Sequence, residues 1–224
     1  MVKFYEKDLV KGVKTIKKSI KEGKGYPSKL SLKDTDGKTH KLSKKQYFGV
    51  YQARNLFRLN HGRFPKYTTY NGKAKLPIVI NYQDNGYQCA CASFNMCVQG
   101  FGEWIDESII AKYFNTGRSG TSPSDMITGA KKLGYKVEKI DRNLKSVKEA
   151  KSKGYGVIAH IDTIKAPCLG YHNNYGHYIC IARVTKPNNY RVYDPTKGVL
   201  SVKPSCIDGA MLDRVINYYS VKPL

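Results

Sequence analysis

Four residues of this 224-residue chain have the types and the order that catalysis by a thiol requires: Gln83, Cys89, His177 and Asp194. A thiol attacks a carbonyl well only as the thiolate, so it needs a base that takes its proton. The base in turn needs an acceptor that orients it. We therefore predict Cys89 as the nucleophile, His177 as the base and Asp194 as the orienting carboxylate. Gln83 can donate its amide to the oxyanion that forms during attack.

The nucleophile is one of two cysteines in the segment 89–93, Cys-Ala-Cys-Ala-Ser. The sequence predicts a helix over 89–99, which Cys89 would open. Unsatisfied N–H groups and the positive end of the dipole lie at a helix N-terminus, and both favour a thiolate. Cys89 is therefore our predicted nucleophile and Cys91 the second candidate. The alternative interpretation is a buried structural cysteine.

Five histidines compete for the role of base. His177 follows a glycine and opens an apolar strand, so its ring can face a cleft while the strand packs behind it. His160 lies in the middle of an apolar run and is expected to be structural. His172 lies in a polar loop that could border the cleft. His40 and His61 lie in the basic N-terminal third.

Asp194 stands at the end of a predicted strand, directly before Pro195. The proline ends the strand and can present the carboxylate toward His177. An antiparallel hairpin would set the two side chains side by side. An ordinary Asp-Pro turn is the alternative interpretation, and Asp162 is the weaker candidate for the acid.

Residues 76–224 show helical patterns first and strand-like patterns later. The expected helices cover 89–99, 106–114, 123–133 and 144–152. The expected strands cover 136–140, 156–162, 177–185 and 190–193, after a linker and first strand in 76–82. This order predicts an α+β domain with a thiol at the start of a helix.

The N-terminal third is strongly basic. Residues 1–75 contain 20 Lys and Arg but five Asp and Glu, a net charge of +15. Residues 76–224 contain 19 and 12, a net charge of +7. Such a module is expected to bind an anionic polymer, either nucleic acid or an acidic cell-wall polymer. A charged surface that only aids solubility is the alternative.

The same third repeats itself. The first predicted helix has an apolar face made of Leu9, Val13, Ile16 and Ile20. The second begins at Ser43, with Gln46 placed to complete a capping box. Each helix ends in a segment of glycine, a basic residue, an aromatic residue and proline, in 23–27 and in 61–65, and turns follow at 36–37 and 71–72. We therefore predict a small, mainly helical repeat domain.

The segment 82–96, which carries Gln83 and Cys89, resembles the papain-like peptidases that process bacteriocin leaders. In that family the cysteine stands in a Cys-Gly-Pro-Ala-Ser stretch. Here Ala92 and Ser93 fall in register, whereas Ala90-Cys91 replaces Gly-Pro. The chain looks most similar to the pseudomurein endoisopeptidases of methanogen viruses, which combine such a domain with pseudomurein-binding repeats. Residues 63–67, Arg-Phe-Pro-Lys-Tyr, resemble the Arg-x-Pro-x-Tyr core of those repeats.

The resemblance implies a papain-like α+β peptidase domain over 76–224 and basic wall-binding repeats over 1–75. It implies cleavage of the alanine–ε-lysine isopeptide bond of pseudomurein and lysis of methanogen walls. The alternatives are a cytoplasmic cysteine peptidase or acyl transferase, and a basic binding protein on an inactive scaffold. The candidate polymer-binding residues are Lys24, Tyr26, Arg63, Phe64, Lys66 and Tyr67. For Tyr26 and Phe64 the alternative is packing against a helix end.

Several expectations concern partners and compartment. Pseudomurein is the expected partner, and nucleic acid is not expected because no DNA-reading motif is present. No apolar run is long enough for a membrane span. The N-terminus lacks a signal-peptide core, so we expect synthesis in the cytoplasm and action on the wall after release or lysis. The six cysteines suggest a reducing compartment rather than a disulfide framework. No metal site is predicted, although the resemblance implies activation by a divalent cation.

Overall fold

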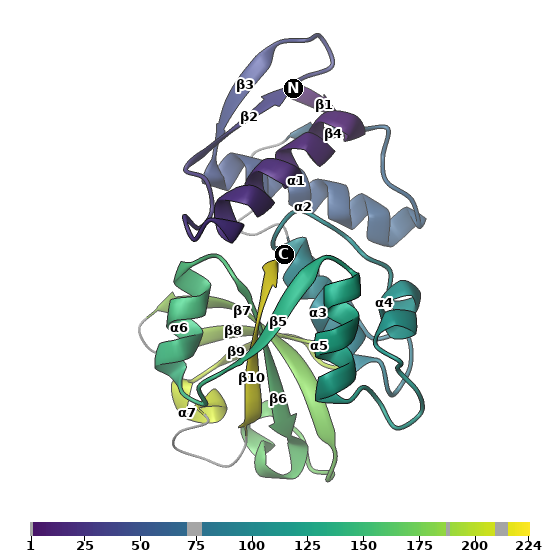
Figure 1. Ribbon diagram of the computed structural model, residues 1–224, viewed down its shortest axis with the longest axis vertical. Coiled ribbons are helices and arrows are strands. Elements are labelled where there is room, and N and C mark those ends of the chain that lie inside the picture. The colour runs from purple at the N-terminus through teal and green to yellow at the C-terminus, as the bar shows by residue number, and fades with distance from the viewer. Residues whose placement is uncertain (1, 71–77, 187–188, 209–214) are drawn as a thin grey trace. The chain divides into compact units, whose positions relative to one another are not determined.

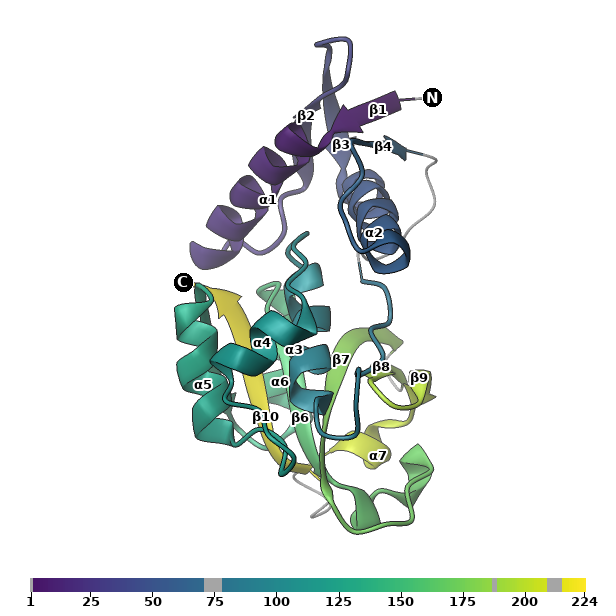
Figure 2. The same ribbon diagram turned by 90° about the vertical axis from the view of Figure 1, so that its right-hand side faces the viewer.

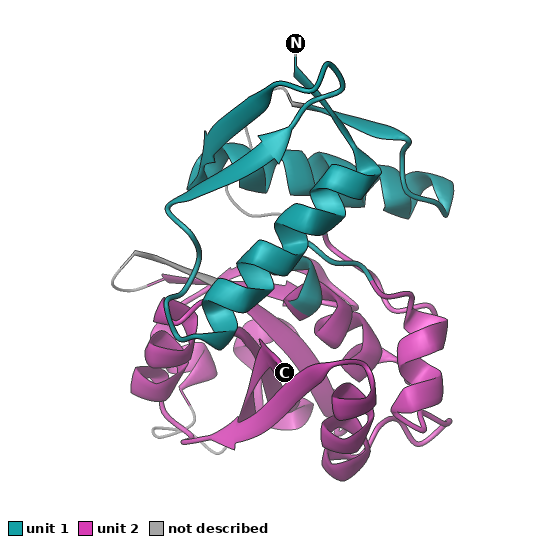
Figure 3. Ribbon diagram, turned by 45° about the horizontal axis from the view of Figure 1, so that its top comes forward, with its two compact units in different colours: residues 1–79, 98–104 teal, residues 80–97, 105–224 magenta. Residues whose placement is uncertain are grey.

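A computed structural model describes residues 2–70, 78–186, 189–208 and 215–224. The chain divides into two compact units (Figure 3), here called the N-terminal and the C-terminal unit. The N-terminal unit comprises Met1–Val79 with Val98–Trp104, and the C-terminal unit comprises Ile80–Cys97 with Ile105–Leu224. The boundary at 75/76 that the sequence suggests lies among residues 71–77, outside the described part of the chain.

The N-terminal unit consists of two β-α-β segments (Figures 1 and 2). The first contains β1 (Val2–Tyr5), α1 (Glu6–Lys21) and β2 (Lys29–Lys33). The second contains β3 (Thr39–Ser43), α2 (Lys44–His61) and β4 (Tyr67–Tyr70). The helices begin at Glu6 and Lys44, and the closing strands begin at Lys29 and Tyr67, so matching elements lie 38 residues apart. The repeat seen in the sequence is therefore a repeat of whole structural segments.

The strands of the two segments are exchanged. β1 pairs with β4, and β2 pairs with β3, both antiparallel. Each segment thus completes its strand pairs with the other segment. The repeat had not predicted this pairing, because periodicity shows which elements recur and not which strands bond. The two segments form one folding unit.

The core of the N-terminal unit lies between the helices and these strands. The apolar face predicted for α1 is buried, as are Tyr47 and Tyr51 of α2. The Tyr51 hydroxyl donates to the carbonyl of Leu9 at 2.8 Å. The predicted capping box is present, with Gln46 Oε1 accepting from the backbone N–H of Ser43 at 2.8 Å. These contacts fix α2 against α1.

The C-terminal unit contains helices followed by a six-stranded antiparallel sheet (Figure 1). Its helices are α3 (Cys89–Gln99, to Cys97 in this unit), α4 (Glu107–Tyr113), α5 (Pro123–Lys132), α6 (Leu144–Ser152) and α7 (Pro204–Ile207), with 3-10 turns η1 (Thr163–Lys165) and η2 (Pro167–Leu169). Its strands are β5 (Tyr135–Ile140), β6 (Gly156–Asp162), β7 (Gly176–Lys186), β8 (Asn189–Asp194), β9 (Gly198–Val202) and β10 (Val215–Pro223). The strand order is β5-β10-β6-β7-β8-β9.

Strand alternation sends the side chains of β7 to two different layers. Tyr178 and Cys180 meet α3, where the Ser93 hydroxyl donates to the Tyr178 carbonyl at 3.0 Å and Cys97 lies 3.6 Å from Cys180. Ile179 and Ile181 enter a separate core cluster with Val147 and Ala150 of α6. The two helices therefore cover opposite faces of the sheet (Figure 1).

Two expectations for this unit were wrong or incomplete. Residues 78–82 form no strand. The strands β9 and β10 and the short helix α7 had not been predicted. β10 lies between β5 and β6 in the sheet, a position that depends on long-range pairing. The helices 89–99 and 144–152 have the expected bounds.

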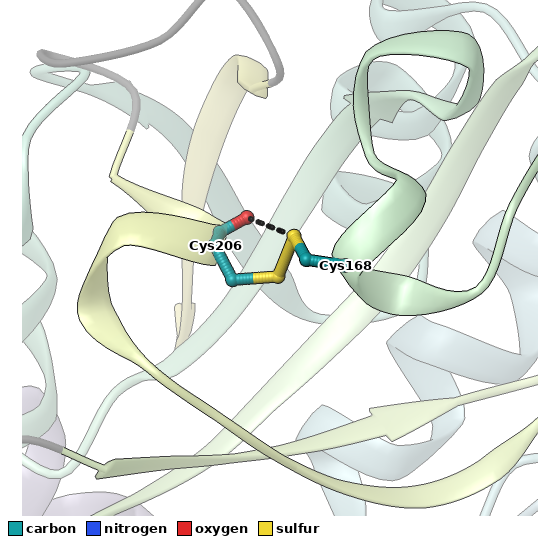
Figure 4. The surroundings of a disulfide bond; sticks show 2 residues. All are labelled: Cys168 and Cys206. Atoms are coloured by element: carbon teal, nitrogen blue, oxygen red, sulfur yellow. Dashed lines mark hydrogen bonds between the residues drawn. A yellow bond between two sulfur atoms is a disulfide. The ribbon is translucent and has the colours of Figure 1, made fainter.

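The expectation of a chain without disulfides was also wrong. Cys168, in η2, is bonded to Cys206, in α7 (Figure 4). The other four cysteines are free and buried. The crowding of three cysteines in 89–97 had argued against a disulfide framework, but the bonded pair comes from two other segments that the fold brings together.

Candidate active site

Cys89 is the first residue of α3 and has 8% of its surface exposed. The first helical hydrogen bond runs from the N–H of Ala92 to the carbonyl of Gln88 at 3.0 Å. The N–H groups of the first turn therefore have no partner within the helix. The positive end of the helix dipole also lies here. Negative charge on the thiol would be stabilised at this position.

His177 and Asp194 lie side by side because β7 and β8 form the antiparallel hairpin that their spacing suggested. His177 Nε2 lies 3.0 Å from Asp194 Oδ1. The histidine residue is 2% exposed and the aspartate is completely buried. Buried ionisable groups need partners, and here each supplies one to the other.

The Asp194 carboxylate is held by four donors. Oδ1 accepts from His177 Nε2 and from the backbone N–H groups of Thr196 and Lys197, at 2.8 and 3.2 Å. Oδ2 accepts from the hydroxyl of Tyr171 at 2.6 Å. Burial alone would raise the pKa of Asp194, but the bonds with His177, Tyr171 and Thr196 hold it below its usual value. The carboxylate is therefore ionised at neutral pH.

The imidazole of His177 connects this carboxylate to the thiol. Burial lowers the pKa of His177, but hydrogen bonds with Asp194 and with Cys89, together with their charges, raise it to about 9. Because Nε2 is engaged by Asp194, Nδ1 is the nitrogen that can exchange a proton with the thiol. The structure thus places His177 between the Asp194 carboxylate, to which it is hydrogen-bonded, and the Cys89 thiol.

Cys91, the second candidate, has different surroundings. It is completely buried, and its sulfur lies 3.3 Å from the Thr116 hydroxyl. Burial raises the pKa of Cys91 to about 11, so the thiol stays protonated at neutral pH. This geometry favours Cys89 as the nucleophile.

Gln83 lies beside the turn that follows Asp194. Its backbone N–H donates to the Pro195 carbonyl at 3.0 Å, and its Oε1 accepts from Thr196 Oγ1 at 3.3 Å. Its Nε2 donates to the Asn85 carbonyl at 2.7 Å. A primary amide carries two N–H groups, so a second one can donate to an oxyanion.

Sequence reasoning missed Glu107, which holds the segment that carries Gln83. This buried side chain accepts from Asn81 Nδ2 at 2.7 Å and from the backbone N–H of Asp84 at 3.3 Å. Burial, and then the charge of Asp84, raise the pKa of Glu107 to about 7. No motif marks this residue, because its partners lie more than 20 positions away in the sequence.

We expect Gln83→Ala to lower kcat by roughly 10²–10³-fold with little change in KM, the usual effect of losing one oxyanion donor. Gln83→Glu keeps the shape but replaces the N–H donors with a carboxylate, so it should be impaired at least as much. Steady-state kinetics on a soluble peptide substrate measure both. Unchanged turnover in Gln83→Ala would remove this assignment.

His160 and Asp162, the alternative candidates for the base and the acid, make contacts that suit structural roles. The ring of His160 stacks on Tyr178 with centroids 4.2 Å apart. Burial and the charge of His177 lower the pKa of His160 to about 4, so it stays neutral. Asp162 lies 3.6 Å from Lys165 Nζ. Neither takes part in the hydrogen bond between His177 and Asp194.

The aromatic candidates of the N-terminal unit are half-buried and packed. Tyr26 meets Phe48 edge-on at 5.1 Å and has Lys44 Nζ over its ring at 4.8 Å. Phe64 has the guanidinium of Arg54 over its ring at 3.9 Å. These contacts agree with the packing alternative for both rings.

The other four candidates for polymer binding have more exposed side chains. Lys24, Arg63 and Lys66 are exposed, and Tyr67 is 45% exposed. Lys24 Nζ lies 2.7 Å from the Glu22 carboxylate, a surface pair of small energetic value. All four positions can be reached by a polymer.

The fold and the placement of a cysteine at the start of α3 define a papain-like α+β protein. A family model described as the peptidase C39 family matches residues 77–208, more than half of the chain. The chain therefore belongs to the peptidase C39 family of cysteine peptidases.

The chain is similar to solved peptidase structures, of which the first below agrees with this fold. The peptidase domain of ComA from Streptococcus, a bifunctional ABC transporter involved in a quorum-sensing pathway, matches with a TM-score of 0.52 at 16% identity, over 65% of this chain and 98% of that domain. A double-glycine-motif protease from an AMS/PCAT transporter, in complex with a leader peptide, matches with a TM-score of 0.49 at 17% identity, over 69% and 96%. No curated protein matches the chain.

Within the residues that the structure describes, no helix combines the length and the apolar character needed to cross a membrane. The same residues contain no group of three His, Cys, Asp or Glu side chains placed to hold a metal ion.

Proposed function

We propose that the protein is a cysteine endoisopeptidase that cleaves the alanine–ε-lysine isopeptide bond of pseudomurein and so lyses methanogen cell walls. The observation that carries the hydrolytic part is the hydrogen-bonded His177–Asp194 pair, which lies next to Cys89 at the start of α3. The substrate is supported by the likeness of residues 63–67 to the core of pseudomurein-binding repeats.

The reaction proceeds by double displacement. The Cys89 thiolate attacks the amide carbonyl, and the Cys89 backbone N–H and Gln83 donate to the oxyanion. His177, protonated on Nδ1, then gives its proton to the leaving ε-amine, while Asp194 holds the ring in orientation. A water that His177 deprotonates hydrolyses the acyl-enzyme and restores the thiol.

The charge of the N-terminal unit suits an acidic wall. Residues 1–75 carry a net charge of +15, and pseudomurein carries uronic acid and glutamate carboxylates. Attraction of this kind raises the local concentration of enzyme at the polymer. The exposed side chains of Lys24, Arg63, Lys66 and Tyr67 would make the contacts, and Tyr26 and Phe64 would support them by packing.

Incubation with isolated pseudomurein walls tests the proposal. Turbidity should fall, and new ε-amino groups of lysine should appear in step with it. The same walls incubated with the Cys89→Ala variant are the matched control. Cleavage of soluble peptides without release of amines from the walls would instead support an ordinary peptidase acting on peptides.

A second prediction concerns wall binding by the full-length protein made inactive with Cys89→Ala. Adding Arg63→Glu and Lys66→Glu should weaken co-sedimentation with walls by roughly tenfold, because attraction becomes repulsion at the proposed contact. Binding should also fall as salt rises, since exposed charges are screened beyond ~8 Å at physiological ionic strength.

The matched control changes the net charge equally on the other unit. Lys145→Glu with Lys148→Glu alters two exposed lysines of α6. This double variant should bind walls within about twofold of its Cys89→Ala parent if the polymer contacts only the region of Arg63 and Lys66. Equal losses in both double variants, or stronger binding to duplex DNA than to walls, would contradict the wall-binding proposal.

A further inference from the structure

We propose that Tyr171 is a positioning residue, which fixes the Asp194 carboxylate and through it the imidazole of His177. This inference rests on the proposed function, because it assigns Asp194 to the active site. Tyr171 is 4% exposed, and its hydroxyl donates to Asp194 Oδ2 at 2.6 Å. Among the residues that the structure describes, it is the one side-chain donor to the carboxylate oxygen that His177 does not use.

The ring of Tyr171 is itself held on several sides. Its centroid lies 5.3 Å from that of His177 and 5.9 Å from that of Tyr175. Lys197 Nζ lies over the ring at 4.3 Å, while the Lys197 backbone N–H donates to Asp194 Oδ1. Tyr171 therefore contacts both members of the His–Asp pair and the turn that supports them.

The segment that carries Tyr171, residues 163–175, is fastened at its base and near its middle. At its base the Thr163 hydroxyl donates to the carbonyls of Asn173 and Tyr175, at 2.5 and 2.8 Å. Near its middle, three residues before Tyr171, Cys168 is bonded to Cys206 of α7 (Figure 4). A segment tied in this way can hold a hydroxyl within hydrogen-bond distance of a buried carboxylate.

Loss of the hydroxyl has a definite electrostatic consequence. The pKa of Asp194 is held down partly by the bond from Tyr171, so removing it favours the protonated acid. A protonated Asp194 no longer stabilises the imidazolium of His177, so the ring holds the proton of the Cys89 thiol less well, and alkylation of Cys89 should begin at a higher pH. Among the described residues, the titratable side chains that interact with Asp194 are those of His177, Tyr171 and Tyr175. Cys89 acts on the other member of the pair, His177, and Lys197 Nζ lies over the Tyr171 ring.

The test is the rate of Cys89 alkylation by iodoacetamide as a function of pH in the full chain, with the site identified by mass spectrometry. This readout needs no substrate. Tyr171→Phe should move the acid limb of the profile upward by roughly one pH unit. Tyr190→Phe is the matched control, because this buried hydroxyl of the same core cluster has no partner among the described residues. Its profile should match that of the wild type.

A double-mutant cycle separates positioning from general packing. If Tyr171 acts through Asp194, Tyr171→Phe should have little further effect in the Asp194→Asn background. An equal shift in both backgrounds, or a Tyr171→Phe profile that matches the wild type, would overturn the inference. In either case a reactive wild-type Cys89 keeps the proposed function intact. A wild-type Cys89 that titrates like an ordinary exposed thiol would remove the proposed function, and the inference with it.

Thermal unfolding shows whether each variant is folded. If Tyr171→Phe does not fold, Cys168→Ser with Cys206→Ser tests the same inference, since it keeps the hydroxyl and releases its segment. The acid limb should then move upward by a smaller amount. An acid limb that does not move in this folded variant would overturn the inference.

Discussion

We expect Cys89→Ala to lower hydrolysis of a soluble isopeptide by at least about 10⁴-fold, whereas Cys91→Ala retains activity within a few-fold. Without the Cys89 thiol no acyl-enzyme can form, and the remaining groups can only bind and polarise the amide. Cys91 is a buried residue of α3 whose sulfur lies within hydrogen-bond distance of the Thr116 hydroxyl. Burial raises the pKa of its thiol to about 11. Replacing Cys91 with alanine therefore removes packing contacts of the thiol but no atom that takes part in the reaction.

Release of ε-amines measures both variants, and circular dichroism with thermal unfolding checks that they are folded. Cys91→Ala leaves a small cavity in a buried helix, so a lower melting temperature is expected for this variant. Trapping of the acyl-enzyme and mass spectrometry should place the acyl group on Cys89. An inactive Cys91→Ala beside an active Cys89→Ala would reverse the assignment of the nucleophile.

The sequence predicted the elements that depend on local patterns. The helix over 89–99 and the capping box at Ser43 follow from residue spacing, and both are confirmed. The hairpin that joins His177 to Asp194 was also correctly predicted, because a short connection favours pairing of neighbouring strands. The α+β class could therefore be predicted before any comparison.

Features that depend on distant contacts could not be predicted in the same way. The central place of β10, the exchanged strands of the N-terminal unit and the bond between Cys168 and Cys206 each join segments far apart in the chain. The residues that position the candidate site could not be predicted for the same reason. Tyr171 and Glu107 carry no motif, and only the fold shows that they hold Asp194 and the segment of Gln83. Residue types indicate the chemistry, whereas tertiary packing decides which neighbours position it.

The second large effect is expected at the His–Asp pair. His177→Ala should be nearly inactive, with a loss of about 10⁴-fold or more, because the thiol loses its proton acceptor and the leaving amine loses its proton donor. Asp194→Asn should lower kcat by roughly 10²–10⁴-fold, since the ring keeps its place but loses the negative charge behind it. Kinetics on the soluble isopeptide measure both losses.

The direction of the accompanying pH shift is fixed by the structure. Burial lowers the pKa of His177, and the bonds and charges of Asp194 and Cys89 raise it to about 9. Removing the charge of Asp194 removes one of the causes that raise it, so the pKa of His177 must fall in Asp194→Asn. The imidazolium is then lost at a lower pH, and the alkaline limb of kcat/KM should move downward. Titration of the His177 ring by NMR measures the same shift without substrate. A His177 pKa that stays near 9 in Asp194→Asn would show that this carboxylate does not hold the imidazolium.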